Sequence, residues 1–232
     1  MHQIHVVYHS NEPRDQIPRI IQVEPLCVPR PPSVPGLING QLASIWISTR
    51  LQRLDFQWLE LLKLFVDGDF QNYHFQLEAT LVSMKRVVDD LVMASYCIFK
   101  GEEVELSRKI EVDGWGQLFR NGKPTVIGQE IIDEFIGEYD SFPGVLNELV
   151  NALKHSYLMA EARNQWNNHF PLVSAITAPR NDYSKEVSVH DHDMAELVLG
   201  FNKFVKQVII KMHPKSVGPV LDLRFHFLGS AS

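Results

Sequence analysis

Apolar residues recur at steps of three and four from residue 41 to residue 98, the longest regular pattern in the chain. The first part of the pattern comprises Leu42, Ile45, Trp46, Leu51, Leu54, Trp58, Leu61 and Phe65. The second part follows a heptad through Phe70, Tyr73, Leu77, Leu81, Met84, Val88, Leu91, Ser95 and Ile98. Such spacing gathers apolar side chains on one face of a helix. Because Asp67-Gly68-Asp69 interrupts the pattern, we predict two long antiparallel helices joined by a short turn. Their aromatic residues favour a globular bundle over a coiled-coil seam.

Shorter patterns predict three further helices. One covers residues 128–139, and the next begins at Ser141, a suitable N-cap, with Pro143 in its first turn, and runs to about residue 163. The last begins after Asp191 or Asp193, either of which can cap it, and ends at His213-Pro214.

Alternating patterns predict short strands between and outside these helices. Val104, Leu106, Ile110 and Val112 fall on alternate positions after Gly101. Residues 171–177 and 185–189 predict a strand pair or a long loop. Residues 4–8 and 221–227 also alternate, and we expect these two terminal strands to pair with each other.

The first forty residues form a separate arm because they hold seven of the thirteen prolines. Proline excludes a helix there, so the arm runs extended or turning. Apolar residues such as Ile20 and Leu26 favour docking on the chain's own core over recruitment of a protein partner. The expected architecture is mainly α: an arm at 1–40, a bundle of about five helices at 41–213 with an insertion at 101–127, and a strand or tail at 214–232.

Composition narrows the classes of function. A formal net charge of −6 argues against a protein that coats nucleic acid non-specifically, which needs a basic surface. The two cysteines, Cys27 and Cys97, lack metal-ligand spacing and suggest reduced thiols. The opening residues do not resemble a secretion signal, and no apolar run reaches the length of a membrane span. We expect a cytoplasmic protein without a membrane segment.

The predicted fourth helix carries the most informative polar residues. At helical spacing Glu148, Asn151 and His155 share one face, with Asn147 and Lys154 at its edge. Leu146, Leu149, Val150, Leu153 and Tyr157 form the opposite, apolar face. Burial of that face would hold the polar groups in fixed relation to one another. The alternative is an ordinary amphipathic helix with a solvated side.

This set of groups suits metal-independent cleavage of RNA. An imidazole such as His155 can take the proton of a ribose hydroxyl, while a cation such as Lys154 steadies the phosphate. Asn151 would orient the imidazole or the substrate. Glu78, Asp89 or Asp90 of the second helix could approach these groups if the two helices pack together.

The layout resembles the higher eukaryotes and prokaryotes nucleotide-binding (HEPN) superfamily of α-helical domains. The resemblance covers residues 41–212 and rests on two long helices followed by a helix bearing N-x-x-K-H. It implies a bacterial or phage protein that binds RNA or nucleotide, acts as a homodimer whose two motifs face each other, and cleaves RNA in a toxin–antitoxin or defence system. Asn151 and His155 match the superfamily's polar residue and histidine. The arginine position holds Val150, which puts catalysis in doubt.

Two other interpretations of the sequence have weaker support. Residues 148–156 are similar to the ATP-binding N-box of sensor histidine kinases, but the glycine-rich elements that would cradle nucleotide are absent. His190 and His192 alternate with Asp191 and Asp193 and could hold a metal ion, although capping of the next helix is the favoured role for the aspartates. We therefore expect no cofactor, and keep a non-catalytic helical protein that dimerises as the competing hypothesis.

Overall fold

The computed structural model describes residues 4–8, 19–23, 28, 30–34, 40–137, 141–155, 171–177 and 188–213. The predicted pair of long helices is confirmed as α1 (Gly40–Asp67) and α2 (Phe70–Phe99). Gly68 turns the chain with a positive φ of 72°, a conformation that glycine adopts without strain. Asp69 then caps α2, because its carboxylate accepts a hydrogen bond from the main-chain N–H of Asn72.

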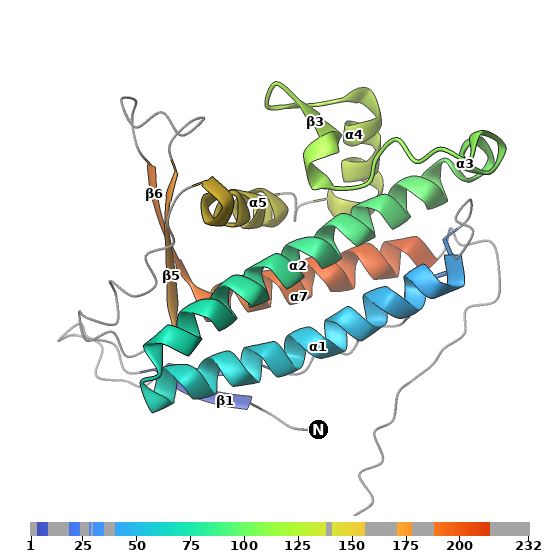
Figure 1. The fold of residues 1–232 in the computed structure, drawn as a ribbon. Coiled ribbons are helices and arrows are strands. Elements are labelled where there is room, and N and C mark those ends of the chain that lie inside the picture. The colour runs from blue at the N-terminus through green and yellow to red at the C-terminus, as the bar shows by residue number, and fades with distance from the viewer. Residues whose placement is uncertain are drawn as a thin grey trace, which may run out of the picture.

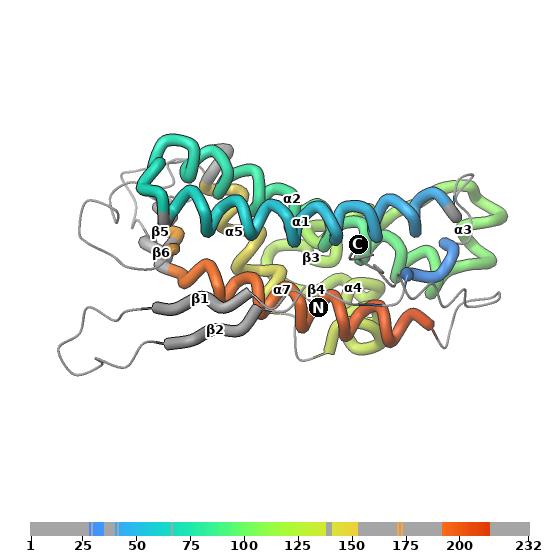
Figure 2. The backbone as a smooth tube through the Cα atoms, turned by 90° about the horizontal axis from the view of Figure 1, so that it is seen from below, coloured from blue at the N-terminus to red at the C-terminus, as the bar shows by residue number. Residues whose placement is uncertain are grey.

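The fold is mainly α, as the periodicity predicts, and helix α2 is its central element. On it pack α1, α5 (Ser141–His155) and α7 (Met194–Met212), and α1 and α5 contact different sides of α2 (Figure 1). The largest fully buried side chains include Tyr73, Leu81, Leu91, Phe135 and Phe204. Helix α1 lies at the edge of the bundle, and in the view from below it lies in front of α2 (Figure 2).

At the N-terminus the arm supplies a strand pair of its own. β1 (Ile4–Tyr8) pairs antiparallel with β2 (Arg19–Val23), a pairing that the sequence patterns did not indicate. A strand has two edges, and residues 221–227 lie outside the described residues, so their expected pairing with residues 4–8 stays a prediction. The other predicted pair is confirmed as β5 (Leu172–Thr177) and β6 (Ser188–Asp193).

Part of the proline-rich arm docks on the chain's own core. Val34 is buried in the hydrophobic core, and the carbonyl of Pro31 accepts a hydrogen bond from the Ser44 hydroxyl. The Ser44 oxygen in turn accepts from Nε of Arg30 at 3.0 Å. For residues 30–34 the structure thus bears out docking on the core.

The insertion after α2 begins with a helix, so the strand predicted from Val104, Leu106, Ile110 and Val112 is wrong. In α3 (Gly101–Ser107) Val104 is buried and Leu106 is exposed, so the two side chains lie on different faces of the helix. Alternating apolar positions over so short a stretch do not distinguish a helix from a strand. Arg108 ends α3 in the left-handed conformation. A short 3-10 turn (Trp115–Leu118) follows, and β3 (Phe119–Arg120) and β4 (Lys123–Pro124) form a tight hairpin through Asn121 and Gly122, both at positive φ.

The remaining helices largely follow the prediction. The helix expected over 128–139 is α4 (Val126–Ile131), continued by a π-helical turn (Ile132–Ile136). Asp193 caps α7 by accepting a hydrogen bond from Ala195 N at 2.8 Å, which confirms one of the two predicted caps. The continuation of α5 to residue 163 lies outside the described residues. None of the described helices has both the length and the hydropathy needed to cross a bilayer.

Candidate functional site

Helix α5 presents two opposite faces, as its sequence predicts. Leu146, Leu149 and Val150 are almost completely buried, and α5 packs on α2. Glu148 and Asn151 are exposed on the other side, and Asn147 is partly exposed. The polar edge therefore faces solvent and is not sealed against a neighbouring helix.

Val150, where the HEPN resemblance would call for an arginine, has an exposed fraction of only 4%. A side chain at this position packs into the core and does not reach the polar face. A phosphate-binding cation would therefore have to come from elsewhere on the helix. Lys154 and His155 are in the last turn of α5, and their side chains lie outside the described residues.

The partners that Glu78 and Asp89 engage lie outside α5. The Glu78 carboxylate lies 3.2 Å from Nε2 of His74, one turn earlier on α2. Asp89 accepts a hydrogen bond from Lys85 Nζ at 2.6 Å and another from the main-chain N–H of Trp115 at 2.8 Å. Asp89 thus anchors the insertion to α2, a role that its sequence position does not reveal.

Asp90 is buried and faces α1. Its carboxylate forms an ion pair with Arg50 of α1 and a second one with Nε of Arg86 at 3.3 Å. Since α1 and α5 pack on different sides of α2, these contacts turn Asp90 away from the polar edge of α5. The structure provides structural roles for Asp89 and Asp90 and does not join them to Asn151.

The described residues provide no support for a metal site at His190 and His192. Among them, no group of three His, Cys, Asp or Glu side chains is placed to hold an ion. His192 is partly exposed on β6, and Asp193 caps α7. The side chain of His190 lies outside the described residues, so the proposed pair of ligands stays a prediction.

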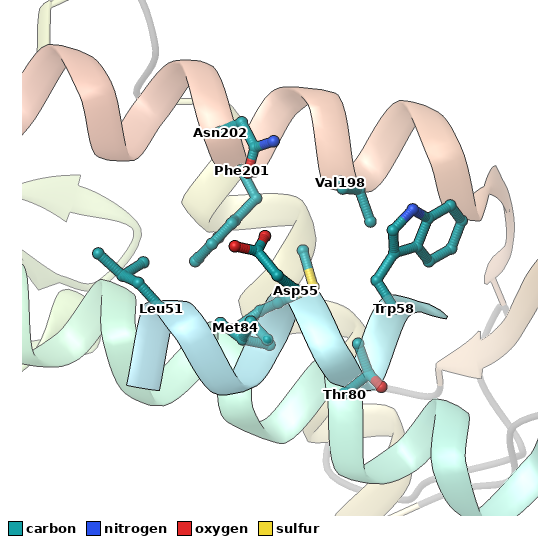
Figure 3. Close-up of a pocket in the computed structure, with 9 residues that line it drawn as sticks. Leu51, Asp55, Trp58, Thr80, Met84, Val198, Phe201 and Asn202 are labelled. Carbon is teal, nitrogen blue, oxygen red and sulfur yellow. The ribbon is translucent and has the colours of Figure 1, made fainter. Parts of the chain in front are cut away.

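A small internal cavity lies where α1, α2 and α7 meet. It has a volume of about 20 Å³ and is lined by Leu51, Leu54, Asp55, Trp58, Thr80, Met84, Val198, Phe201 and Asn202. Figure 3 shows the Asp55 carboxylate directed from α1 toward α7, where Asn202 lies. Such a volume admits about one water molecule, so this cavity is not a substrate site.

A larger hollow of about 250 Å³ opens on the outside of the α1–α2 pair. It is lined by Ala43, Trp46, Ile47, Arg50, Asp90 and Met93. Partial burial, and the neighbouring charge of Arg86, lower the pKa of Arg50 from its ordinary value. The ion pair with Asp90 of α2 holds this guanidinium in the lining of the hollow, between α1 and α2.

The outer face of α1 is the feature that sequence reasoning missed. Leu42, Ile45, Trp46, Phe56 and Leu59 have exposed fractions between 42% and 70%. The sequence pattern assigned the first three to the core, but the buried apolar residues of α1 are Ile47, Leu51, Leu54, Trp58 and Leu61 on the opposite side. A second apolar periodicity, offset from the first, was the signal that separates the two faces.

Comparison with protein-family models, curated sequences and solved structures finds no match to this chain.

Proposed function

We propose that this protein is a non-catalytic helical protein that associates with a second copy of itself through the outer face of α1. The observation that carries the proposal is the row of exposed large apolar side chains along that helix. Exposed apolar patches of several hundred Å² on soluble domains mark interaction surfaces. The exposed apolar residues of this row offer on the order of 500 Å² of apolar side chain.

The size of this surface suits a modest dimer. A stable interface buries about 800 Å² on each partner, so the apolar row and its polar border together approach that value. Aromatic residues are enriched at the centres of such interfaces, and Trp46 and Phe56 are the most exposed large side chains of α1. We expect a dimer that dissociates on dilution.

Sedimentation equilibrium of the purified protein over a wide concentration range tests this function. The average mass should rise from that of a monomer toward that of a dimer, and Phe56→Glu should hold it at the monomer value. The matched control is Leu106→Glu, which introduces the same charge at an exposed leucine of α3 and should leave association unchanged. A monomer at every concentration would overturn the proposal.

The second candidate function is the binding of RNA or nucleotide at the polar face of α5, which the HEPN resemblance implies. It is supported by the exposure of Asn151 opposite the buried Leu149 and Val150. In this candidate Lys154 supplies the cation and His155 the base or the phosphate donor. Burial of Val150 favours binding, or weak cleavage, over efficient catalysis.

Fluorescence anisotropy with a labelled single-stranded RNA tests this second candidate. Lys154→Ala should weaken binding at low salt, whereas Lys203→Ala, at an exposed lysine of α7, should not. His155→Ala should abolish any cleavage that persists in a chelator while leaving the far-ultraviolet circular dichroism unchanged. Equal RNA affinity of the unmodified protein, Lys154→Ala and Lys203→Ala, together with no cleavage, would remove this candidate.

A further inference from the structure

The exposed residues of α1 follow a heptad of their own. Leu42, Ile45, Thr49, Gln52, Phe56 and Leu59 succeed one another at steps of three, four, three, four and three, and all are exposed. This spacing is that of the a and d positions of a coiled-coil seam, which needs a partner helix. The described part of the chain supplies no such helix, because α2 contacts the opposite side of α1.

The order of these residues is nearly the same from either end. Two apolar residues precede a polar pair, and two apolar residues follow it. We infer that two copies of α1 pair antiparallel about a centre between Arg50 and Leu51. Each copy then places Leu42 against Leu59, Ile45 against Phe56 and Thr49 against Gln52 of the other copy. The inference rests on the proposed dimer and specifies how its copies are arranged.

The polar residues that border the seam favour the antiparallel arrangement. Trp46 and Arg53 lie one heptad apart on the same edge of α1, and both are exposed. Antiparallel pairing brings Trp46 of one copy beside Arg53 of the other, twice by symmetry, where guanidinium and indole attract each other. In a parallel pair the two copies would place these positions on opposite edges of the seam, so Trp46 and Arg53 of different copies would not meet.

The two central layers, in each of which Thr49 of one copy faces Gln52 of the other, set the alignment at a cost in affinity. A polar residue inside a seam finds hydrogen-bonding partners only in the matched register, so it specifies alignment and weakens association. Replacing both residues by leucine should therefore tighten the dimer by about tenfold or more, because two polar layers become apolar. Both side chains are exposed in the single chain, so the replacement does not disturb the core.

Cysteine cross-linking tests the orientation in a Cys27→Ser background, where Cys97 is the other cysteine and is buried. A mixture of Ile45→Cys and Phe56→Cys proteins should form mixed disulfides under mild oxidation, whereas Ile45→Cys alone should not. Self-linking of Ile45→Cys would show a parallel pair and overturn the inference. A mixture of Leu106→Cys with Phe56→Cys controls for random collision.

Sedimentation separates failure of this inference from failure of the proposed function. A dimer that cross-links in the parallel sense, or one whose affinity does not rise with Thr49→Leu and Gln52→Leu, leaves the function standing and removes the antiparallel seam. A chain that stays monomeric even with both leucines removes both. Tighter association of the leucine variant together with mixed disulfides supports both.

Discussion

The carboxylate of Asp89 on α2 accepts a hydrogen bond from the main-chain N–H of Trp115 at 2.8 Å, across 26 residues of sequence. This contact holds the 3-10 turn of the insertion against the central helix. Trp115 is buried there and its ring packs on Phe119, with 5.0 Å between the ring centroids. A residue that the sequence suggests for a catalytic site thus positions a structural segment.

Asp89→Ala should lower the free energy of unfolding by about 1–3 kcal/mol, because the N–H of Trp115 loses its acceptor in a buried position. Urea denaturation followed by circular dichroism measures the change. Glu78→Ala provides the control, since its partner His74 is on the same helix and their contact is partly solvated. A loss as small as that of Glu78→Ala would contradict the anchoring role.

Two glycines allow a matched test of packing. A Cβ at Gly128 would lie 2.1 Å from the carbonyl oxygen of Leu118, whereas a Cβ at Gly144 of α5 meets nothing within 4 Å. Gly128→Ala should cost about 1–3 kcal/mol through the forced shift of backbone. Gly144→Ala should instead stabilise the protein by up to about 1 kcal/mol, because alanine favours the helix. The two melting temperatures should move in opposite directions. Shifts in the same direction would contradict the tight packing at Gly128 and the open space at Gly144.

The sequence predicts those parts of the fold in which one periodicity dominates. The α1–α2 turn follows from Asp67-Gly68-Asp69, and the start of α7 follows from the capping residue Asp193. The pattern wrongly predicted a strand at Val104 and Leu106, because a seven-residue helix is too short to show a helical period.

The candidate site was less predictable than the fold. Opposite faces of α5 could be read from spacing, and the described residues bear this out. The partners of Asp89 and Asp90 depend on how the insertion and α1 pack on α2, and these are long-range contacts that no local pattern contains. The outer face of α1 was hidden because two apolar periodicities overlap in one helix.

Cys97 provides a test at alkaline pH. It is completely buried, and desolvation raises the pKa of its thiol from 9.0 to about 11. Because the folded state favours the neutral thiol, its contribution to stability is full below pH 9 and is lost as the pH rises toward 11. The free energy of unfolding should fall in this window by up to about 1.4 kcal/mol per pH unit.

Cys97→Ala should make this alkaline decline shallower, as judged from urea titrations at pH 8, 9 and 10. In a Cys27→Ser background the native protein should also resist a thiol reagent and react after denaturation. The comparison between variants is needed because burial also raises the pKa of Tyr73. An unchanged slope, or rapid labelling of the native protein, would disprove the burial argument.

The ion pairs of Asp90 should show unequal consequences for its two partners. Asp90→Ala leaves the guanidinium of Arg50, which is two-thirds covered, without its carboxylate at the α1–α2 contact, and should cost about 1–2 kcal/mol because solvent partly screens the remaining charge. Arg86→Ala should cost less than about 1 kcal/mol, since the Arg86 side chain is 62% exposed and Arg50 still neutralises the carboxylate. A double-mutant cycle of Arg50→Ala with Asp90→Ala, measured by urea denaturation, isolates the buried pair. Additive losses would mean that Arg50 and Asp90 stabilise the helix pair independently, and that the charge contact between α1 and α2 is not what fixes their alignment.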